Sequence, residues 1–414
     1  MLRVVATLTG PDAEEDASFV DGIGLGERVV NRQGVLGRSL RVEMADDGGD
    51  DDETTRLVRE AVRVPGTSAV LVVGPGQAVT AARRAIEIPR TPVFLLGGDL
   101  YSTQGLFRQV FQVSVPLRWQ AAVLARYFLA DRGYGRVSTI RETDDDEVGG
   151  IGHWPEHPGE DALGEAMVEE GQPLGLQLGL TRGFARSEAS AESLKELEPA
   201  GAVTLFGSPT MAVRVARWLG DLNTPPQMAM LADGLRGTFD SLPLGTVAPY
   251  SYTWAPWAEP IRRVAAFRDL CERVLGHPPQ GFEQEGYDAV RLLADALRRS
   301  DGRGGDPLVA ALESFTEARY SSTPIRLGPD DHLFPVDRWV GIFAVEREGD
   351  DDPWGPSWAA WRPVMRTFTT NGERTIIPDI DRDVFFPGWR PREPAPDFWT
   401  ARYGITTRRR DPLH

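Results

Sequence analysis

The densest group of side chains that could bind a cation is the acidic run from Asp46 to Glu53 in the segment MADDGGDDDE. A helix–loop–helix calcium site has the cadence D-x-D-x-D-G with a distal glutamate, and this run lacks that cadence. The run follows the alternating residues of LRVEM (40–44) and precedes a helical pattern. We therefore interpret it as a solvated loop between a strand and a helix. Asp51 and Asp52 then lie in the first helical turn, where the helix dipole stabilises each carboxylate by about 0.3–1 kcal/mol.

A second candidate for metal binding is the segment HWPEH (153–157), which contains His153, Glu156 and His157. These residue types bind zinc, but Pro155 interrupts the helix that would present them and no fourth ligand is evident. Two interpretations stay open, a solvated loop, which we favour, and a zinc site. The acidic residues 144–147 just before it are interpreted as an exposed rim.

Motifs for nucleotide binding and hydrolysis are incomplete. The segment VGPGQAV contains G-x-G, but Val79 stands where a dinucleotide fingerprint has its third glycine, and the segment follows the third strand rather than the first. There is no G-x-S-x-G motif. Ser208 in FGSPT has no assignable partner among the five histidines. We therefore expect no catalytic site and no cofactor.

Composition narrows the class of protein further. The 414 residues are 41% hydrophobic, enough to form two or three domains with cores of their own. The net charge of −16 and the pI of about 4.9 argue against nucleic-acid binding. With a mean hydropathy of −0.29 and no apolar run near the roughly 20 residues of a membrane span, the chain is expected to be soluble. The single cysteine, Cys271, has helical spacing in AAFRDLCERVLG and is expected to be buried.

Apolar runs that alternate with helical patterns predict parallel sheets with helical crossovers. The predicted strands are residues 2–8, 40–44, 69–73, 92–96, 136–140, 174–178, 202–206 and 227–232. The predicted helices between them are residues 13–32, 53–63, 77–88, 117–132, 160–170, 189–198 and 209–221. Two sets of four such units fit two doubly wound lobes better than one very wide sheet.

The positions of apolar residues also predict which faces are buried. In the strand at 40–44, the residues Leu40, Val42 and Met44 share one face. In the helix at 13–32 the shared face has the residues Phe19, Ile23, Gly26 and Val30.

The chain changes character after residue 245. The segment 245–260 is rich in aromatic residues and proline, and two amphipathic helices are predicted at 258–275 and 283–300. In the second helix the apolar stripe comprises Tyr287, Val290, Leu293, Ala294 and Leu297. A late strand is predicted at 338–345, and residues 351–414, rich in Trp and Pro without clear periodicity, are expected to form an extended tail on the surface.

The order of these landmarks resembles a known family. TGP closes the first strand, NRQGVLGRSLRVEMADDGGD carries the second, and VVGPGQAVTAA follows the third. RGYGRVSTI opens the second half, and VTLFGSPTMAVRVARWLGDL and EQEGYDAVRLLADAL complete the set. Together these motifs resemble the leucine/isoleucine/valine-binding family of type I periplasmic solute-binding proteins, over roughly residues 2–345.

The resemblance implies an α/β fold with two Rossmann-like lobes, a hinge of three crossing strands and a ligand held between the lobes. Ligands of open α/β sheets bind beyond the carboxyl ends of the strands, which agrees with this arrangement. The expected domains are lobe 1 (1–113 and 249–325), lobe 2 (114–248 and 326–350) and a C-terminal extension (351–414).

Candidate ligand-binding residues follow from the resemblance, position by position, and all come shortly after predicted strands or near the hinge. In the first lobe they are Glu15 after strand one, Gly76 and Gln77 after strand three, and Gly98 and Asp99 after strand four. In the second lobe they are Ser208 and Thr210 in FGSPT, and Asp233, which matches an acidic position that binds the ligand ammonium. Aromatic residues that could stack on a ligand are Trp119, Tyr250, Tyr252 and Trp254.

The sequence departs from the family at two of these positions. The tandem hydroxyl residues expected near Gln77 are absent, and Asp99 is acidic where a ligand carboxylate would bind. A carboxylate beside Asp99 would meet a repulsion of about 1–4 kcal/mol at 4 Å. Glu15, Asp99 and Asp233 could instead line an acidic cleft for a cationic or amide-bearing ligand. The alternative is that one or two of these acids cap helices or pair with arginines.

The expected function is that of a non-enzymatic solute-binding protein for ABC-type uptake of a small, polar, amino-acid-like, amide or cationic ligand. Its partner would be an ABC permease or a receptor. A ligand-sensing domain of a receptor or an intracellular regulator is an alternative, and a metal-dependent enzyme using HWPEH is another. Because residues 2–8 resemble a strand rather than a signal peptide, the protein is extracytoplasmic only if a leader was removed and is otherwise cytoplasmic.

Overall fold

The structure is a computed structural model, and of some helix and strand residues only the backbone is described. The described residues are 1–10, 13–74, 90–97, 108–114, 120–121, 124–125, 127–128, 132–143, 175, 177–185, 201–207, 209–222, 225–230, 246–250, 261–277, 279, 282–321, 324–329, 331–334, 341–345 and 361–363.

The chain forms two compact units. Unit 1 comprises Met1–Val115 and Phe282–Val336, and unit 2 comprises Pro116–Gly281 with strands β13 and β14. Over the part of the chain that the structure describes, which ends at residue 363, the chain therefore passes from one unit to the other three times, after residues 115, 281 and 336. The boundaries expected from the sequence were 113, 248 and 325, so the two divisions differ most at the second passage.

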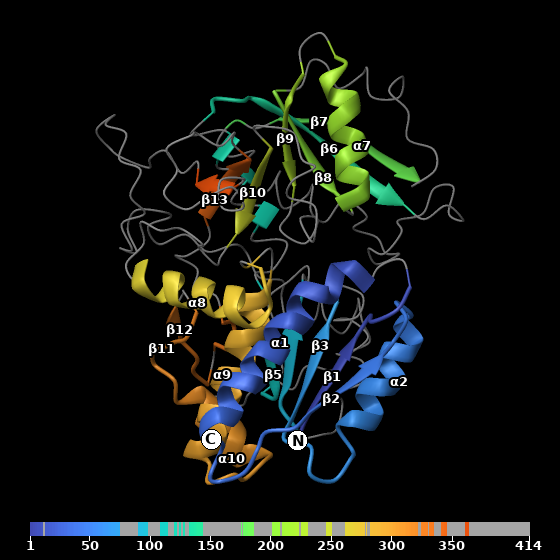
Figure 1. The fold of residues 1–414 in the computed structure, drawn as a ribbon. Coiled ribbons are helices and arrows are strands. Elements are labelled where there is room, and N and C mark those ends of the chain that lie inside the picture. The colour runs from blue at the N-terminus through green and yellow to red at the C-terminus, as the bar shows by residue number, and fades with distance from the viewer. Residues whose placement is uncertain are drawn as a thin grey trace, which may run out of the picture. The chain divides into compact units, whose positions relative to one another are not determined.

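Unit 1 contains a five-stranded sheet in the order β2-β1-β3-β4-β5, and every pair of neighbours is parallel (Figure 1). Its strands are β1 (Leu2–Ala6), β2 (Val42–Asp46), β3 (Ala69–Val73), β4 (Val93–Leu96) and β5 (Val110–Gln112). All residues of β3, β4 and β5 are buried, as expected for parallel strands covered on both faces.

Helices cover both faces of this sheet. On one face, α2 (Asp51–Ala61) places Val58 and Ala61 in a core cluster with alternate strand residues such as Val72 and Leu95. The other helices of unit 1 are α1 (Ala13–Gln33), α9 (Glu283–Arg299) and α10 (Asp306–Glu313), and α1 contacts β3 while α9 contacts β4. A two-stranded ribbon of β11 (Ala318–Arg319) and β12 (Pro324–Ile325) completes the strands of unit 1.

Helices α1 and α9 are about 250 residues apart in the sequence but pack closely against each other (Figure 1). Glycines permit this approach, since a Cβ at Gly22 would lie 1.9 Å from the carbonyl oxygen of Glu283 and one at Gly286 would lie 2.3 Å from that of Phe19. The predicted apolar faces are confirmed at the contact. The buried side chains are Phe19, Ile23 and Val30 on α1 and Tyr287, Val290, Leu293, Ala294 and Leu297 on α9.

Unit 2 contains a seven-stranded sheet in the order β14-β13-β10-β9-β8-β6-β7. Strands β6 (Arg136–Thr143), β7 (Gln177–Ala185), β8 (Ala202–Phe206), β9 (Gln227–Met230) and β10 (Val247–Tyr250) are parallel. Their order repeats that of unit 1, with β6 to β10 in the places of β1 to β5. The antiparallel strands β13 (Gly341–Val345) and β14 (Trp361–Pro363) extend the sheet beyond β10. Two helices of unit 2 are α7 (Pro209–Gly220) and α8 (Ile261–Val274).

Several expectations are corrected in detail. Strand β2 begins two residues later than predicted, and Met44 is 39% exposed because β2 is an edge strand. Strand β7 covers residues 177–185 instead of 174–178. Of the tail expected to be extended, residues 361–363 form β14, an edge strand of the sheet, and the other residues of 351–414 lie outside the described ones.

Other features agree with the sequence analysis or lie outside it. Cys271 is buried, as predicted. Strands β5 and β10 and helix α10 were not predicted. The helices expected at 77–88, 117–132, 160–170 and 189–198 lie wholly or largely outside the described residues. Among the described helices, none is both long and apolar enough to cross a membrane.

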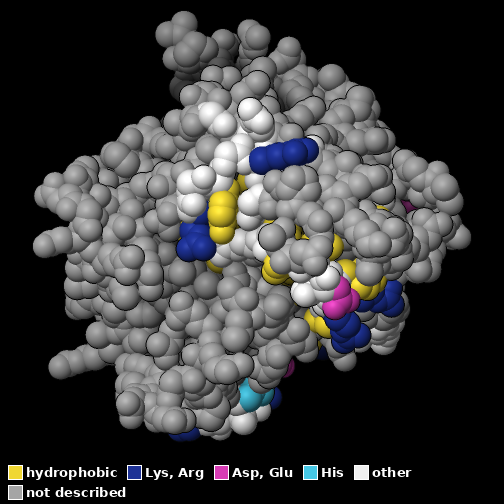
Figure 2. Space-filling view, turned by 90° about the horizontal axis from the view of Figure 1, so that it is seen from above, with side chains coloured by type: hydrophobic (Ala, Val, Ile, Leu, Met, Phe, Trp, Pro, Cys, Tyr) yellow, Lys and Arg dark blue, Asp and Glu magenta, His cyan; other side chains and the backbone are white. Residues whose placement is uncertain are grey.

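The surface charge of the described residues can be followed in Figure 2. The basic side chains in that view are arginines, because the single lysine, Lys195, is not among the described residues. They lie at separate places on that face, so the described side chains form no continuous basic patch there.

Candidate functional site

The strand order identifies one location in each unit for ligand binding. In a doubly wound sheet of order 2-1-3-4-5, the crossover direction reverses between strands one and three, and ligands bind beyond the carboxyl ends of these strands. In unit 1 these ends are Ala6 of β1 and Val73 of β3. In unit 2 they are Thr143 of β6 and Phe206 of β8.

In unit 1, residues 8 and 9 of the loop that leaves β1 bond to the carboxylate of Asp46 at the end of β2. Asp46 Oδ1 accepts hydrogen bonds from the amide groups of Leu8 (2.9 Å), Thr9 (3.3 Å) and Gly48 (3.0 Å). Asp46 Oδ2 accepts a hydrogen bond from the hydroxyl of Thr9 at 2.5 Å. The bond from the Thr9 hydroxyl, with the backbone bonds beside it, holds the pKa of Asp46 below its ordinary value. Strand β1 therefore ends at Ala6 instead of residue 8, because residues 8 and 9 bond to a side chain.

The next aspartate in the chain, Asp47, lies in a buried polar layer below this loop. Its carboxylate accepts hydrogen bonds from the hydroxyls of Thr7 (2.9 Å) and Thr54 (2.8 Å) and from the amide of Gly49 (3.0 Å). The amide of Thr7 donates to Asp16 Oδ2 at 3.0 Å, which ties β1 to the first turns of α1. Asp16 and Asp47 are both buried, so these groups fix the loop rather than face solvent.

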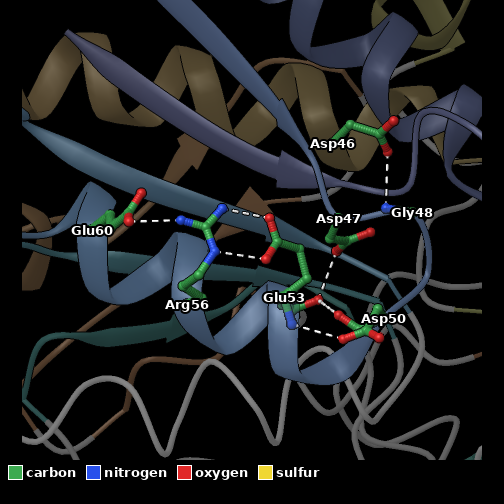
Figure 3. Close-up of polar contacts among 8 residues, drawn as sticks. Asp46, Asp47, Gly48, Asp50, Glu53, Arg56 and Glu60 are labelled. Atoms are coloured by element: carbon green, nitrogen blue, oxygen red, sulfur yellow. Dashed lines mark hydrogen bonds and ion pairs between the residues drawn. The ribbon is translucent and has the colours of Figure 1, made fainter.

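The rest of the acidic run leads into helix α2, as predicted (Figure 3). Asp50 is the N-cap and accepts a hydrogen bond from the amide of Glu53 at 2.8 Å. The partly buried Glu53 and the exposed Glu60 both pair with Arg56. The prediction of a solvated loop is wrong for Asp47, which is 4% exposed and accepts hydrogen bonds from the hydroxyls of Thr7, just after β1, and of Thr54 in α2.

The ends of β4 and β5 in unit 1 are tied to helix α9. The amide of Gly97, which follows β4, donates to Ser114 Oγ at 2.8 Å, and Ser114 Oγ donates to the carboxylate of Glu285. Ser114 and Glu285 are buried, and Glu285 lies in the first turn of α9, where the helix dipole stabilises its charge. These contacts tie Gly97 and Ser114, which follow β4 and β5, to the first turn of α9.

In unit 2, helix α7 begins at Pro209, three residues after the end of β8. Proline is favoured in the first helical turn because that turn leaves its amide groups without helical acceptors. Met211, Val215 and Leu219 of α7 pack in a core cluster with Leu205 of β8, which fixes the helix over the sheet. The amino end of α7 therefore follows directly from the carboxyl edge of the sheet.

The structure gives the chain positions of the predicted site residues but not their side chains. Backbone alone is described for Glu15 in α1, Thr210 in α7 and Tyr250 in β10. The predicted residues outside the described ones are Gly76, Gln77, Gly98, Asp99, Trp119, Ser208, Asp233, Tyr252 and Trp254. Six of these follow the end of β3, β4, β8 or β9 by two to four residues, since these strands end at Val73, Leu96, Phe206 and Met230. Their roles in binding therefore stay predictions.

The candidate metal ligands also lie outside the part of the chain that the structure describes. This holds for His153, Glu156 and His157 and for the acidic residues 144–147. Within the described part of the chain, no group of three His, Cys, Asp or Glu side chains is arranged to hold a metal ion.

Sequence reasoning missed the residues that hold the strand-end loops of unit 1. These residues are Thr7, Asp16, Asp46, Asp47, Ser114 and Glu285. The run at 46–53 was noticed, but the signal for Asp46 and Asp47, two acids directly after a strand, was assigned to solvent. Ser114 and Glu285 are 171 residues apart, and no local pattern connects them.

In a comparison with sequence models of protein families, residues 4–341 match the periplasmic binding protein family. The chain belongs to the periplasmic binding protein family. This match covers most of the chain and confirms the resemblance expected from the sequence motifs. A search of curated protein sequences gave no significant match.

Solved structures similar to this periplasmic binding protein confirm the type I fold. A leucine-binding protein from Thermotoga maritima MSB8 has a TM-score of 0.70 and 15% identity, covering 84% of this chain and 95% of its own. A type 1 periplasmic binding protein from Bordetella pertussis Tohama I has a TM-score of 0.69 and 18% identity, covering 84% and 97%. An ABC transporter solute-binding protein from R. palustris, solved with benzoate, has a TM-score of 0.69 and 15% identity, covering 88% and 94%.

Proposed function

We propose that this periplasmic binding protein is a non-enzymatic solute-binding protein, which closes its two units on a small polar ligand and delivers it to an ABC permease outside the cytoplasm. The observation that carries the proposal is the repeated strand order of the two units. Each unit has a switch point at the carboxyl ends of its strands, and the described part of the chain passes between the units three times. The family match supports the same function.

The residues proposed to bind the ligand follow the strand ends. In unit 1 they are Glu15, Gly76, Gln77, Gly98 and Asp99, and in unit 2 they are Ser208, Thr210, Asp233 and the aromatic residues Trp119, Tyr250, Tyr252 and Trp254. Asp233 comes three residues after β9 and is proposed to bind an ammonium or amide group of the ligand.

The proposed ligand class is small and polar, with a cationic, amide or amino-acid-like group. Three of the proposed residues, Glu15, Asp99 and Asp233, are acidic and would oppose a bare carboxylate nearby. Similar proteins have been solved with isoleucine, leucine, benzoate and 3,4-dihydroxybenzoic acid, so amino acids and aromatic acids belong in any test.

A thermal-shift screen over amino acids, amino-acid amides, polyamines and aromatic acids tests the proposal. A ligand at about 100 times its Kd stabilises a protein by roughly 2.7 kcal/mol, which gives a clear rise in Tm. We expect at least one of these classes to give a saturable rise with one binding site per chain. A complete screen without any such rise would contradict the proposal.

The role of Asp233 is tested with the amine-bearing or amide-bearing ligand that the screen finds. We expect Asp233→Ala to weaken binding at least tenfold, measured by calorimetry, because the variant lacks the proposed counter-charge. Asp221→Ala, which changes an exposed aspartate after α7, is the matched control and should bind as the unchanged protein does. Equal affinity in the two variants would refute the role of Asp233.

A further inference from the structure

Four hydrogen-bond donors of unit 1 converge on the carboxylate of Asp46. Three are backbone amides, from Leu8, Thr9 and Gly48, and the fourth is the Thr9 hydroxyl. Two of the amides and the hydroxyl belong to the loop that follows β1, and the third amide belongs to the loop that follows β2. The donors thus come from two separate loops at the same edge of the sheet.

Converging backbone amides of this kind form a concavity that binds anions such as carboxylates and phosphates. In this chain the anion is supplied internally, by a side chain that is only partly buried. The hydrogen bonds of the four donors favour the ionised form and lower the pKa of Asp46, so that this side chain is an anion at neutral pH.

The loop that Asp46 holds lies where a ligand is expected to bind. The loop after β1 lies at the switch point of unit 1, where a ligand of this fold is expected. Leu8, Thr9 and Gly10 are exposed, so the loop itself is accessible while its Leu8 and Thr9 amides are used by Asp46.

We propose that Asp46 is a positioning and specificity-determining residue, which fills the anion-binding concavity of the β1 loop and so denies those donors to a carboxylate of the ligand. The ligand-specificity part rests on the proposed solute-binding function. Asp46 does not touch the ligand in this account; it fixes Leu8 and Thr9 and makes the local potential negative. Ligands that place an amide, hydroxyl or ammonium group at this loop are therefore favoured over ligands that place a carboxylate there.

The first test needs no knowledge of the ligand, because a small carboxylate can replace the missing side chain. We expect Asp46→Ala to lower Tm, and sodium formate to restore about 2–4 °C in a saturable manner, compared with sodium chloride at equal ionic strength. If Asp46→Ala does not fold in buffer, it should fold in the formate series and not in the chloride series.

Glu53→Ala provides the matched control for formate. Glu53 is, like Asp46, a partly buried residue in the same loop-to-helix segment, but its carboxylate bonds to the guanidinium of Arg56 instead of to backbone amides. Formate should have the same small effect on this variant as on the unchanged protein. An Asp46→Ala variant that responds to formate no more than Glu53→Ala would overturn the anion-binding concavity.

The second test concerns specificity and uses L-leucine with L-leucinamide, and benzoate with benzamide, as probe pairs. In Asp46→Ala the amides of Leu8 and Thr9 are free to bind a ligand carboxylate. For the pair that binds, we therefore expect the ratio of the affinity for the acid (L-leucine or benzoate) to that for the amide (L-leucinamide or benzamide) to rise about tenfold. An unchanged ratio, with formate still restoring stability, would overturn the specificity role. If no probe binds at all, the solute-binding function itself is in question, whereas the formate result still tests the concavity.

Discussion

At the scale of single residues, unit 1 contains two carboxylates in opposite environments. Asp46 is partly exposed and accepts four hydrogen bonds, which lower its pKa. Asp288 of α9 is fully buried, and this burial raises its pKa to about 7, although the amide and hydroxyl of Ser321 both donate to it. Desolvation therefore outweighs two hydrogen bonds at Asp288, whereas hydrogen bonding outweighs desolvation at Asp46.

The raised pKa of Asp288 predicts a pH-dependent stability. Between pH 4 and about 7 the folded state holds a proton that the unfolded state has released, so the stabilising effect is complete below pH 4 and is lost as the pH rises to about 7. We expect the free energy of unfolding of the unchanged protein to fall across this range relative to Asp288→Asn, by at most about 1.4 kcal/mol per pH unit. Denaturant titrations of both proteins at several pH values measure this difference.

Asp46→Asn is the control for that experiment. In the unchanged protein the pKa of Asp46 is lowered from its ordinary value, so this carboxylate is ionised throughout the range tested. The difference in free energy of unfolding between the unchanged protein and Asp46→Asn should therefore be constant between pH 4.5 and 7. Parallel stability curves for the unchanged protein and Asp288→Asn would show that Asp288 is ionised throughout and would refute the prediction.

At the scale of elements, the strands that were predicted most accurately are those buried on both faces. Strands β3 and β8 match their predicted bounds because AVLVV and AVTLF are continuous apolar runs between polar residues. Strand β5 was missed because its three residues, VFQ, are too few to show a period. Strand β10 was missed because VAPY contains a proline and lies in an aromatic segment.

The candidate site was predictable only in its chain positions. The ends of strands locate the loops, and parallel strands place those loops at one edge of the sheet. The groups that hold the loops were not predictable, because contacts such as Thr7 with Asp47 and Ser114 with Glu285 join residues 40 and 171 positions apart.

The contact between α1 and α9 predicts opposite effects for two neighbouring glycines. A Cβ at Gly22 would overlap the backbone of α9, whereas a Cβ at Gly24 has nothing within 4 Å. We expect Gly22→Ala to destabilise the protein by about 1–3 kcal/mol or more through overpacking. Gly24→Ala should stabilise it by about 0.5–1 kcal/mol through helix propensity. Equal changes in Tm for the two variants would contradict the close approach of the helices.

At the scale of the whole molecule, the chain repeats one α/β plan in two units, and its described residues pass between the units three times. Two of these passages begin side by side within unit 1. The amide of Gln112 donates to the carbonyl of His332 at 2.9 Å, and the amide of Phe334 donates to the carbonyl of Gln112 at 2.9 Å. Paired backbones at this point provide a defined base for a hinge, the element that a closing solute-binding protein requires.

The most direct test of closure is small-angle X-ray scattering with and without the ligand that the screen identifies. We predict one ligand bound per chain and a smaller radius of gyration in the saturated protein, because two units that close on a ligand become more compact. A saturated protein with an unchanged radius of gyration would contradict closure as the functional step.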